Sequence, residues 1–249
     1  MKKWKLIGML VTLALLRLAA PAAAAGSQAE STTLPGEEIV ARAWKAMFGE
    51  RSSADLRSIY VEGYFHGAAV PNRQTVRRPN LFRNETRAGV LVFDGKRAAW
   101  ATRAPDEKGN PRGPELIEEK YWRHFEVDIA IIFPAFFDHP AELRGIEAVD
   151  GSDAYKLFVP LPLGGSVTYF VDARSFLVTK RMVSWDGDGK GTEPPWENLI
   201  EGYVETDGVR FPDGYVYAGR DGREKGRYQN VRFNVDAPGE LFKIPDELN

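Results

Sequence analysis

The fold is decided by two neighbouring stretches of the chain: Val76-Arg77-Arg78-Pro79-Asn80-Leu81-Phe82-Arg83 and, nine residues later, Val92-Phe93-Asp94-Gly95-Lys96, followed by Trp100. The segments 73–87, 90–93 and 98–101, which contain these residues, are predicted to be β-strands. An Asp-Gly pair at Asp94 separates the last two segments, and this pair favours the tight turn that joins antiparallel strands. We therefore expect an antiparallel sheet in this part of the chain.

One helix and one strand are predicted before these stretches. The helix opens at Pro35 and ends at Gly49, and its apolar residues recur at helical spacing: Ile39, Ala43, Trp44 and Met47. The β pattern begins after it, with a strand predicted over residues 59–65.

The centre of the chain interrupts the β pattern. Residues 115–125 and 127–137 are predicted to be two helices, the second of them strongly apolar. Six strands are predicted after them, at residues 154–159, 166–172, 177–185, 199–206, 215–219 and 228–235. The chain has seven Asp-Gly pairs, mostly between predicted strands. This order of elements predicts an α+β fold with one large antiparallel sheet covered by helices.

The quoted stretches resemble the LolA-type periplasmic lipoprotein carriers, in which an R-P-N-L-F run lies on a strand and an S/F-D-G-K turn starts the next hairpin. The N-terminal helix and the run Glu240–Pro245 are also similar to that family, and the strand Tyr169–Ala173 suits its wider superfamily. The resemblance implies a single large curved antiparallel sheet, an incomplete barrel, that curls around helices acting as plug and lid. It also implies an apolar cavity between the sheet and the helices.

Two interpretations of the apolar residues stay open. On the carrier interpretation, aromatic residues of the strands face apolar residues of the lid across a cargo cavity, and the residues concerned are Phe65, Phe82, Phe93, Trp100, Ile131, Ile132, Phe136 and Phe137. On the other interpretation, the same side chains fill an ordinary close-packed core.

Arg78 matches the arginine that precedes proline in the family motif. The resemblance implies that it locks the lid by hydrogen bonds when the cavity is empty. A guanidinium suits this role because it offers five donors in a fixed fork. The alternative is a solvated strand arginine, with Arg77 pointing to the opposite face. Pro79, which has no N–H, fits an edge position or a bulge.

The first 25 residues are predicted to be a secretory signal peptide, cleaved near Ala25. Three lysines, Lys2, Lys3 and Lys5, precede an apolar run that ends in alanines. The expected order is therefore a signal peptide at 1–25, a disordered lead-in at 26–34 and one half-barrel domain at 35–249. We expect a periplasmic protein without a permanent membrane anchor, because no later stretch approaches eighteen consecutive apolar residues.

Composition excludes several classes of function. The chain has no cysteine, so an exported protein of this sequence has no disulfide and no cysteine for N-terminal lipid attachment. Removing the signal peptide takes away four cationic residues and no acidic one, which lowers the formal charge from −2 to −6. An acidic protein of this kind is a poor candidate for binding nucleic acid.

No catalytic residue, metal site or cofactor is predicted. The three histidines, His66, His124 and His139, form no zinc-binding motif, and no nucleophile elbow is present. The segment from Asp186 to Glu197 is a partial calcium-loop pattern, but Lys190 occupies a ligand position, and a polar hairpin loop is the preferred interpretation.

The function that the resemblance implies is a periplasmic carrier, or chaperone, of acylated cargo on its way to the outer membrane. Its expected partners are the acyl chains of lipoproteins or free lipids, an inner-membrane transporter and an outer-membrane acceptor. One alternative is a periplasmic sensor or regulatory binding protein of the same fold without carrier activity. A hydrolase is a third interpretation, because scattered Ser, His and Asp residues can meet in space.

Overall fold

The computed structural model describes residues 34–65, 69–184, 195–219 and 222–244. The predicted signal peptide, the lead-in up to Thr33, His66 and most of the partial calcium loop lie outside the described residues. The remainder belongs to one compact unit, which begins at Leu34.

The described residues form a single antiparallel sheet of thirteen strands. The strands are β1 (Ser58–Tyr64), β2 (Asn72–Arg77), β3 (Leu81–Glu85), β4 (Gly89–Phe93), β5 (Ala98–Thr102), β6 (Glu115–Leu116), β7 (Glu142–Val149), β8 (Ser152–Pro160), β9 (Ser166–Asp172), β10 (Val178–Ser184), β11 (Trp196–Thr206), β12 (Val209–Gly219) and β13 (Gly222–Phe233). The predicted α+β class with one large sheet is confirmed.

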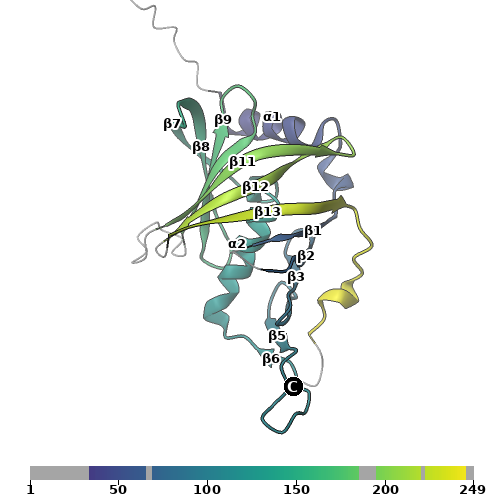
Figure 1. Cartoon of the computed structure of the whole chain (residues 1–249). Helices are drawn as coiled ribbons and strands as arrows, with labels where there is room; N and C mark the ends of the chain where they lie inside the picture. Colours follow the sequence, from purple (N-terminus) through teal and green to yellow (C-terminus); the bar gives the residue numbers. More distant parts are fainter. Residues whose placement is uncertain (1–33, 66–68, 185–194, 220–221, 245–249) are drawn as a thin grey trace, which may run out of the picture. The chain divides into compact units, whose positions relative to one another are not determined.

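The order of the strands joins two meanders into one sheet. It runs β6-β5-β4-β3-β2-β1-β13-β12-β11-β10-β9-β8-β7, so every neighbour follows in sequence except the pair of β1 and β13. That pair is antiparallel and brings Ile59 opposite Phe233. The sheet is not closed, because β6 and β7 remain as its two edges. The long strands β11, β12 and β13 cross the structure in Figure 1.

Two α-helices accompany the sheet, and the first is the helix predicted after Pro35. Helix α1 spans Gly36–Phe48, and its buried residues are Ile39, Ala43, Met47 and Phe48. Two glutamates in its first turn favour the positive end of the helix dipole. It ends at Gly49, whose φ of 65° suits glycine and whose N–H donates to the carbonyl of Lys45.

Helix α2 (Trp122–Ile132) is buried on two sides, and it runs behind β12 and β13 in Figure 1. Phe125, Ile129 and Ile132 pack in a core cluster with residues of β1 to β5, β12 and β13. Val127 and Ala130 belong to a second cluster, with residues of β8, β9 and β10. A helix that is apolar on opposite faces is expected inside a protein, and here it fills the space between the two halves of the sheet.

Four short 3₁₀ helices complete the described structure: η1 (Ser53–Asp55), η2 (Glu119–Tyr121), η3 (Ala135–Phe137) and η4 (Gly239–Phe242). Phe242 of η4 is buried with Val92 and Ala237 in a separate small cluster. Among the residues described, no helix has the length and apolarity that a membrane crossing requires.

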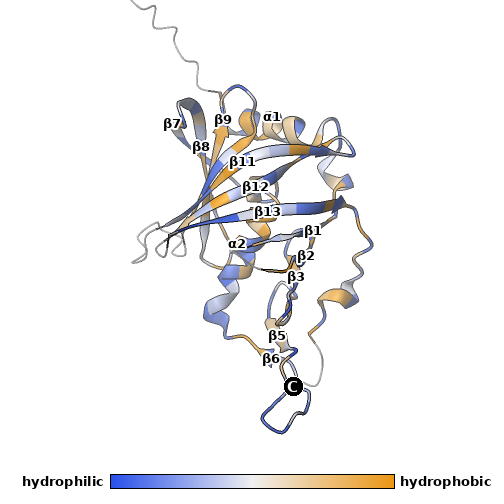
Figure 2. Cartoon of the chain, viewed as in Figure 1, coloured by the Kyte–Doolittle hydropathy of each residue, from blue (hydrophilic) through white to orange (hydrophobic). Residues whose placement is uncertain are grey.

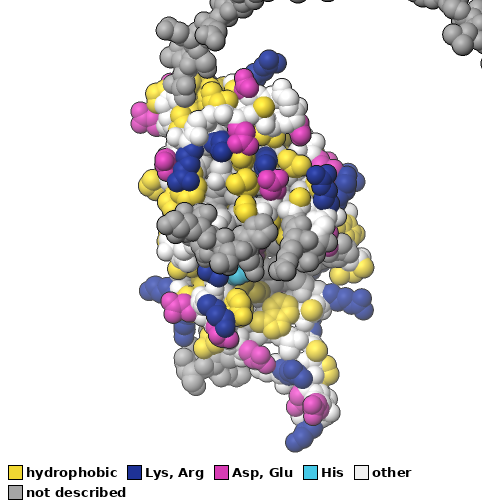
Figure 3. All heavy atoms as spheres, turned by 90° about the vertical axis from the view of Figure 1, so that its left-hand side faces the viewer, with side chains coloured by type: hydrophobic (Ala, Val, Ile, Leu, Met, Phe, Trp, Pro, Cys, Tyr) yellow, Lys and Arg dark blue, Asp and Glu magenta, His cyan; other side chains and the backbone are white. Residues whose placement is uncertain are grey.

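Hydrophilic residues predominate along β13, as Figure 2 shows, because its exposed positions carry Arg, Lys, Glu, Gln and Asn. On the face seen in Figure 3, charged side chains of both signs are mixed with hydrophobic ones. This face therefore carries no extended field of one sign.

The prediction that residues 73–87 form one strand is wrong. The segment divides into β2 and β3, and Arg78-Pro79-Asn80 forms the turn between them, with a cis bond before Pro79. The R-P-N run therefore lies on a turn and not on a strand. This placement gives Pro79 a position where no ladder hydrogen bond is required.

One further prediction in the chain's centre is wrong, and one strand there was missed. Residues 115–125 do not form a helix, because β6 and η2 occupy 115–121 and α2 continues through Glu126 to Ile132. Strand β7 was not predicted, because all but two of its eight residues are exposed and it lacks an apolar face.

The Asp-Gly pairs have two structural roles. At Asp150 and Asp207 the aspartate and the glycine after it all have positive φ, as the tight hairpin turn requires. The pair at Asp213 was predicted to favour a turn, but it lies inside β12. A Cβ on Gly214 would lie 2.8 Å from the carbonyl oxygen of Gly226, so this glycine permits a close approach of two strands.

Candidate functional site

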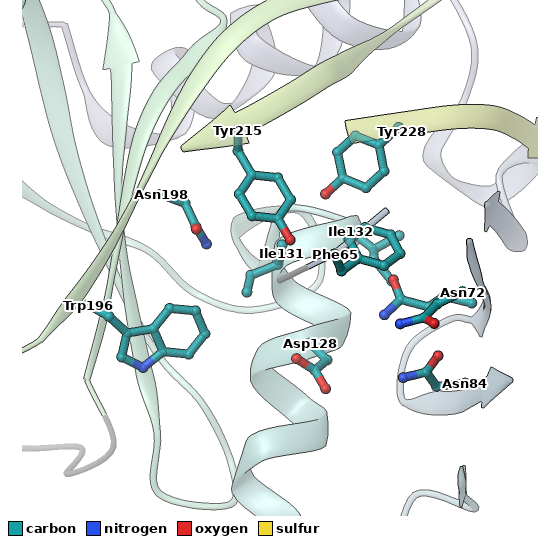
Figure 4. Close-up of a pocket in the computed structure, with 11 residues that line it drawn as sticks. Phe65, Asn72, Asn84, Asp128, Ile131, Ile132, Trp196, Asn198, Tyr215 and Tyr228 are labelled. Atoms are coloured by element: carbon teal, nitrogen blue, oxygen red, sulfur yellow. The ribbon is translucent and has the colours of Figure 1, made fainter. Parts of the chain in front are cut away.

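A cavity of about 210 Å³ lies between α2 and the sheet. Its lining comes from α2 and from both halves of the sheet, as Figure 4 shows, and consists of Phe65, Asn72, Gln74, Asn84, Asp128, Ile131, Ile132, Trp196, Asn198, Tyr215 and Tyr228. The pair of β1 and β13 places the two halves side by side, so residues more than a hundred positions apart meet here.

The wall of this cavity is more polar than the sequence predicted. Four lining residues are amides, two are tyrosines and one is an aspartate, whereas an apolar cavity was expected. Tyr215 and Tyr228 direct their hydroxyl groups toward the space beside α2 (Figure 4). A Cβ on Gly226 would lie 2.3 Å from Cζ of Tyr215, so the Tyr215 ring lies directly over this glycine.

Asp128 is the acidic group of the cavity, and α2 carries it. It has neither an ion pair nor a hydrogen bond among the described residues, and burial raises its pKa to about 7. Burial also raises the pKa of Tyr215 and Tyr228, so both hydroxyls stay protonated at neutral pH. The cavity thus holds a carboxyl group that is partly protonated near neutral pH.

Arg78 binds the end of the segment that supplies the helical wall of the cavity. We call residues 122–138, which contain α2 and η3, the lid segment. The guanidinium of Arg78 donates through Nε and Nη2 to the carboxylate of Asp138, at 3.1 and 2.5 Å. Through Nη1 it donates to the carbonyl oxygens of Ser53 and Leu56, both at 2.6 Å. One side chain therefore joins the turn after β2, the segment around η1 and the end of the lid segment.

The surroundings of Arg78 strengthen these contacts. The side chains of Arg78 and Asp138 are 11% and 17% exposed, so water competes little for their bidentate pair. The guanidinium also lies 4.3 Å from the ring centroid of Phe133, at the end of α2. Arg77, by contrast, is exposed, and its one hydrogen bond within the described part of the chain is to the carbonyl of Ala237, at 3.4 Å. The turn after β2 thus directs the two arginines to different partners.

Tyr169 on β9 is a second anchor of the lid segment, which the sequence did not predict. Its hydroxyl donates to the carbonyl of Ala130 and accepts from the N–H of Ala135, both at 2.8 Å. It thereby binds the two backbone groups on either side of the bend between α2 and η3. The sequence of β9 does not predict this contact, because it depends on which helix end lies against the strand in the folded protein.

Three of the eight predicted cavity residues line the cavity: Phe65, Ile131 and Ile132. Phe82 and Phe93 are fully buried in the core cluster, where Phe93 lies 5.8 Å from the ring of Phe125. Trp100 on β5 is half-buried, and its ring lies over Gly89.

The remaining two, Phe136 and Phe137, belong to η3. The ring of Phe136 lies 4.8 Å from that of Tyr169, and the ring of Phe137 lies 4.9 Å from that of Trp44 on α1. These side chains hold the lid segment against its neighbours. A movement of the lid segment would expose both apolar side chains to solvent.

The amides of the cavity were not predicted, although the sequence carries a signal for two of them. Asn72 and Gln74 are half-buried and stand four and two residues before the fully buried Val76 on β2, whereas Arg73 and Arg77 are exposed. Side chains two residues apart on a strand share a face, so a buried valine places these two amides inside the curve of the sheet.

The described residues contain no group of His, Asp and Glu side chains that could hold a metal ion. His124 lies on α2 and His139 follows η3, and they do not converge on the cavity. Glu197, the last position of the partial calcium loop, forms an ion pair with Lys180 at 2.7 Å.

Two solved structures share this architecture over most of the chain. A LolA superfamily protein from Nitrosomonas europaea is 15% identical, with a TM-score of 0.54 over 85% of this chain and 99% of that one. A DUF1329 family protein from Desulfovibrio piger is 12% identical, with a TM-score of 0.50 over 85% of this chain and 98% of that one. No family model matches the sequence, and no curated protein is significantly similar to it. The chain therefore has the LolA-like fold that the resemblance predicted.

Proposed function

We propose that this protein is a non-enzymatic, periplasmic carrier that binds acylated cargo between its lid segment and the inner face of its sheet. The observation that carries the proposal is the buried helix α2, which lies inside an open sheet of LolA-like fold and is held at one end by Arg78. Export rests on the predicted signal peptide at residues 1–25. Transfer toward the outer membrane, from an inner-membrane donor to an acceptor, is the process that the family resemblance implies.

The size of the cavity supports a mechanism in which the lid segment moves. At about 210 Å³ the cavity is smaller than the ~300 Å³ at which pockets for small ligands begin. An acyl chain therefore has to displace part of α2, and it would take the place of apolar side chains such as Ile129 and Ile132. Each buried methylene contributes about 0.8 kcal/mol, which offsets the lost contacts of the helix.

The polar contacts of the lid segment suit a reversible movement. Tyr169 binds it through hydrogen bonds to the carbonyl of Ala130 and the N–H of Ala135, and Arg78 binds it through the carboxylate of Asp138. These contacts are directional and few, so they can break and re-form as a set while the strands keep their ladders. A close-packed core without such contacts would have no defined closed state to return to.

Displacement of a hydrophobic fluorescent probe tests the proposal. The mature protein is loaded with the probe and titrated with a triacylated lipopeptide, and the deacylated peptide serves as the control. We expect only the acylated peptide to displace the probe. A probe that does not bind, or equal displacement by both peptides, would refute the carrier proposal and favour the interpretation as a regulatory binding protein.

A further inference from the structure

A fully buried arginine lies on the inner face of the sheet beside the cavity. Arg181 on β10 is 1% exposed and is the largest fully buried side chain of the described residues. In the ladder it is opposite Tyr169 on β9 and Asn198 on β11, so the three side chains project from the same face. That face is the inner one, because the Tyr169 hydroxyl donates to Ala130 of α2.

No acidic side chain among the described residues forms an ion pair with the guanidinium of Arg181. Its Nε and Nη1 atoms have no hydrogen-bond acceptor among the described residues. The hydroxyl of Tyr228 is within hydrogen-bonding reach, but it is a neutral group. A guanidinium keeps its charge at every physiological pH, and a buried charge is strongly unfavourable without a counter-charge. An anion at this position would remove the imbalance.

Asn198 extends the same polar wall into the cavity. It is 1% exposed, lines the cavity, and neither its side-chain nitrogen nor its oxygen has a partner among the described residues. Tyr228 lines the cavity as well. Arg181 lies opposite Asn198 on the neighbouring strand and within hydrogen-bonding reach of Tyr228, and the side chains of Asn198 and Tyr228 line the cavity, as Figure 4 shows.

Neither Glu197 nor Asp128 neutralises Arg181. Glu197 precedes Asn198 and so projects to the outer face, where it pairs with Lys180 at 2.7 Å. Asp128 faces the cavity from α2 but forms no ion pair with a described residue, and its half-protonated state near neutral pH limits its charge. The described part of the chain thus leaves a positive charge available to a ligand.

We propose that Arg181, Asn198 and Tyr228 bind the oxyanion head group, a carboxylate or a phosphate, of an amphiphilic cargo. The apolar part of this cargo would lie along Phe65, Ile131 and Ile132, which also line the cavity. This inference rests on the proposed function and specifies the charge of the cargo's head. A neutral head group would leave the buried guanidinium of Arg181 without a counter-charge. The site should therefore bind anionic head groups more tightly than neutral ones.

The test compares ligands of equal chain length that differ only in the head group. Binding of decanoate, decyl phosphate and decan-1-ol to the full mature protein is measured by calorimetry at pH 8. We expect each anion to bind at least about tenfold more tightly than the alcohol, as charge-assisted hydrogen bonds to a buried cation predict. Acetate and inorganic phosphate, tested alone, distinguish an amphiphile site from a site for free anions.

Variants on one strand separate charge from folding. Arg181→Met should reduce the preference for the anions over decan-1-ol to near unity, whereas Arg181→Lys should keep part of the preference. Lys180→Met removes the neighbouring cation on the outer face and should have no effect on the preference. If Arg181→Met does not fold, Asn198→Leu and the head-group series on the unsubstituted protein still decide the question.

The outcomes distinguish this inference from the proposed function. Equal affinity for decanoate and decan-1-ol, or an unchanged preference in Arg181→Met, would overturn the anion site and leave the carrier proposal standing. Tight binding of phosphate or acetate without any effect of the alkyl chain would also overturn it, because the site would then serve free anions. Failure of all three alkyl ligands to bind would refute the carrier proposal and the anion site together.

Discussion

At the scale of single residues, the proposed function predicts that Arg78 keeps the lid segment closed. Arg78→Leu removes four hydrogen bonds to the lid segment and to the segment around η1. We expect the association rate of a hydrophobic probe to rise by about tenfold or more, because a loss of ~1.4 kcal/mol from the closed state changes its population tenfold. Stopped-flow fluorescence measures this rate.

The neighbouring arginine provides the control for Arg78. Arg77→Leu removes the same charge from the adjacent position, but Arg77 has only one long contact to Ala237. Its probe kinetics should match those of the unsubstituted protein. If Arg78→Leu lowers the free energy of unfolding while probe association stays unchanged, Arg78 is a structural residue and not a lock.

Asp128 makes stability depend on pH. Its pKa in the folded protein is about 7 because of burial, well above the value of 3.8 for an exposed aspartate. The folded state therefore binds this proton more tightly than the unfolded state, and stability falls as pH rises from about 4 to 7. Asp128→Asn removes that dependence.

Thermal melting of the two proteins across this range measures the effect. We expect Asp128→Asn to melt at least about 4 °C above the unsubstituted protein at pH 8, a difference that should disappear at pH 4. Glu126→Gln is an informative comparison, because Glu126 accepts a hydrogen bond from the N–H of Leu163. A constant difference between the melting temperatures at all pH values would mean that Asp128 is ionised throughout.

The residues of the site differ in how far the sequence predicts them. Arg78 was found because its neighbours form a motif, and a short motif fixes local geometry. Arg181, Asn198 and Asp128 belong to no motif, and their burial follows from a sheet register that joins strands distant in sequence. A polar residue on a strand interrupts the alternation of apolar residues, and such a residue is usually exposed to solvent. A buried polar residue therefore cannot be told from an exposed one by sequence alone.

At the scale of elements, the contact of β12 with β13 shapes the cavity wall. A Cβ on Gly226 would come within 2.3 Å of the Tyr215 ring, so Gly226→Ala should push this ring toward the cavity. We expect a loss of about 1–3 kcal/mol in the free energy of unfolding, as for other overpacked sites, together with weaker probe binding. Urea denaturation and probe titration measure the two effects.

Gly202 on β11 is the matched control for this substitution. A Cβ at Gly202 would meet no atom within 4 Å, and its backbone is not in the left-handed region. Gly202→Ala should therefore leave both probe affinity and stability nearly unchanged. Equal effects of the two substitutions would show that the Tyr215 ring does not depend on the glycine beneath it.

The elements with strong periodicity were predictable, and those fixed by tertiary contacts were not. Helix α1 and strand β9 follow from their own patterns of apolar residues. Helix α2 was divided wrongly at Glu126, a buried residue whose carboxylate accepts a hydrogen bond from the distant Leu163 N–H, a contact that the local sequence does not report. Strand β7 is exposed and is held by its ladder to β8, which sequence periodicity does not report.

At the scale of the whole described unit, the sheet and the lid segment differ in how they are held. Each strand has ladder partners, and the pair of β1 and β13 joins the two halves into one sheet. The lid segment has no ladder and depends on apolar packing and on the contacts of Arg78 and Tyr169. We therefore expect this segment to open at a lower free energy than the strands around it.

Hydrogen exchange in the presence and absence of cargo tests this difference in full. If an acyl chain replaces α2 in the core, amides of residues 125–133 should exchange faster in the loaded protein, while those of β1 and β13 should stay equally protected. The reason is that cargo takes over the apolar contacts of the helix but none of the hydrogen bonds between strands. Slower exchange throughout α2 on loading would mean that cargo binds to a closed lid segment, and the 210 Å³ cavity would then be the complete binding site.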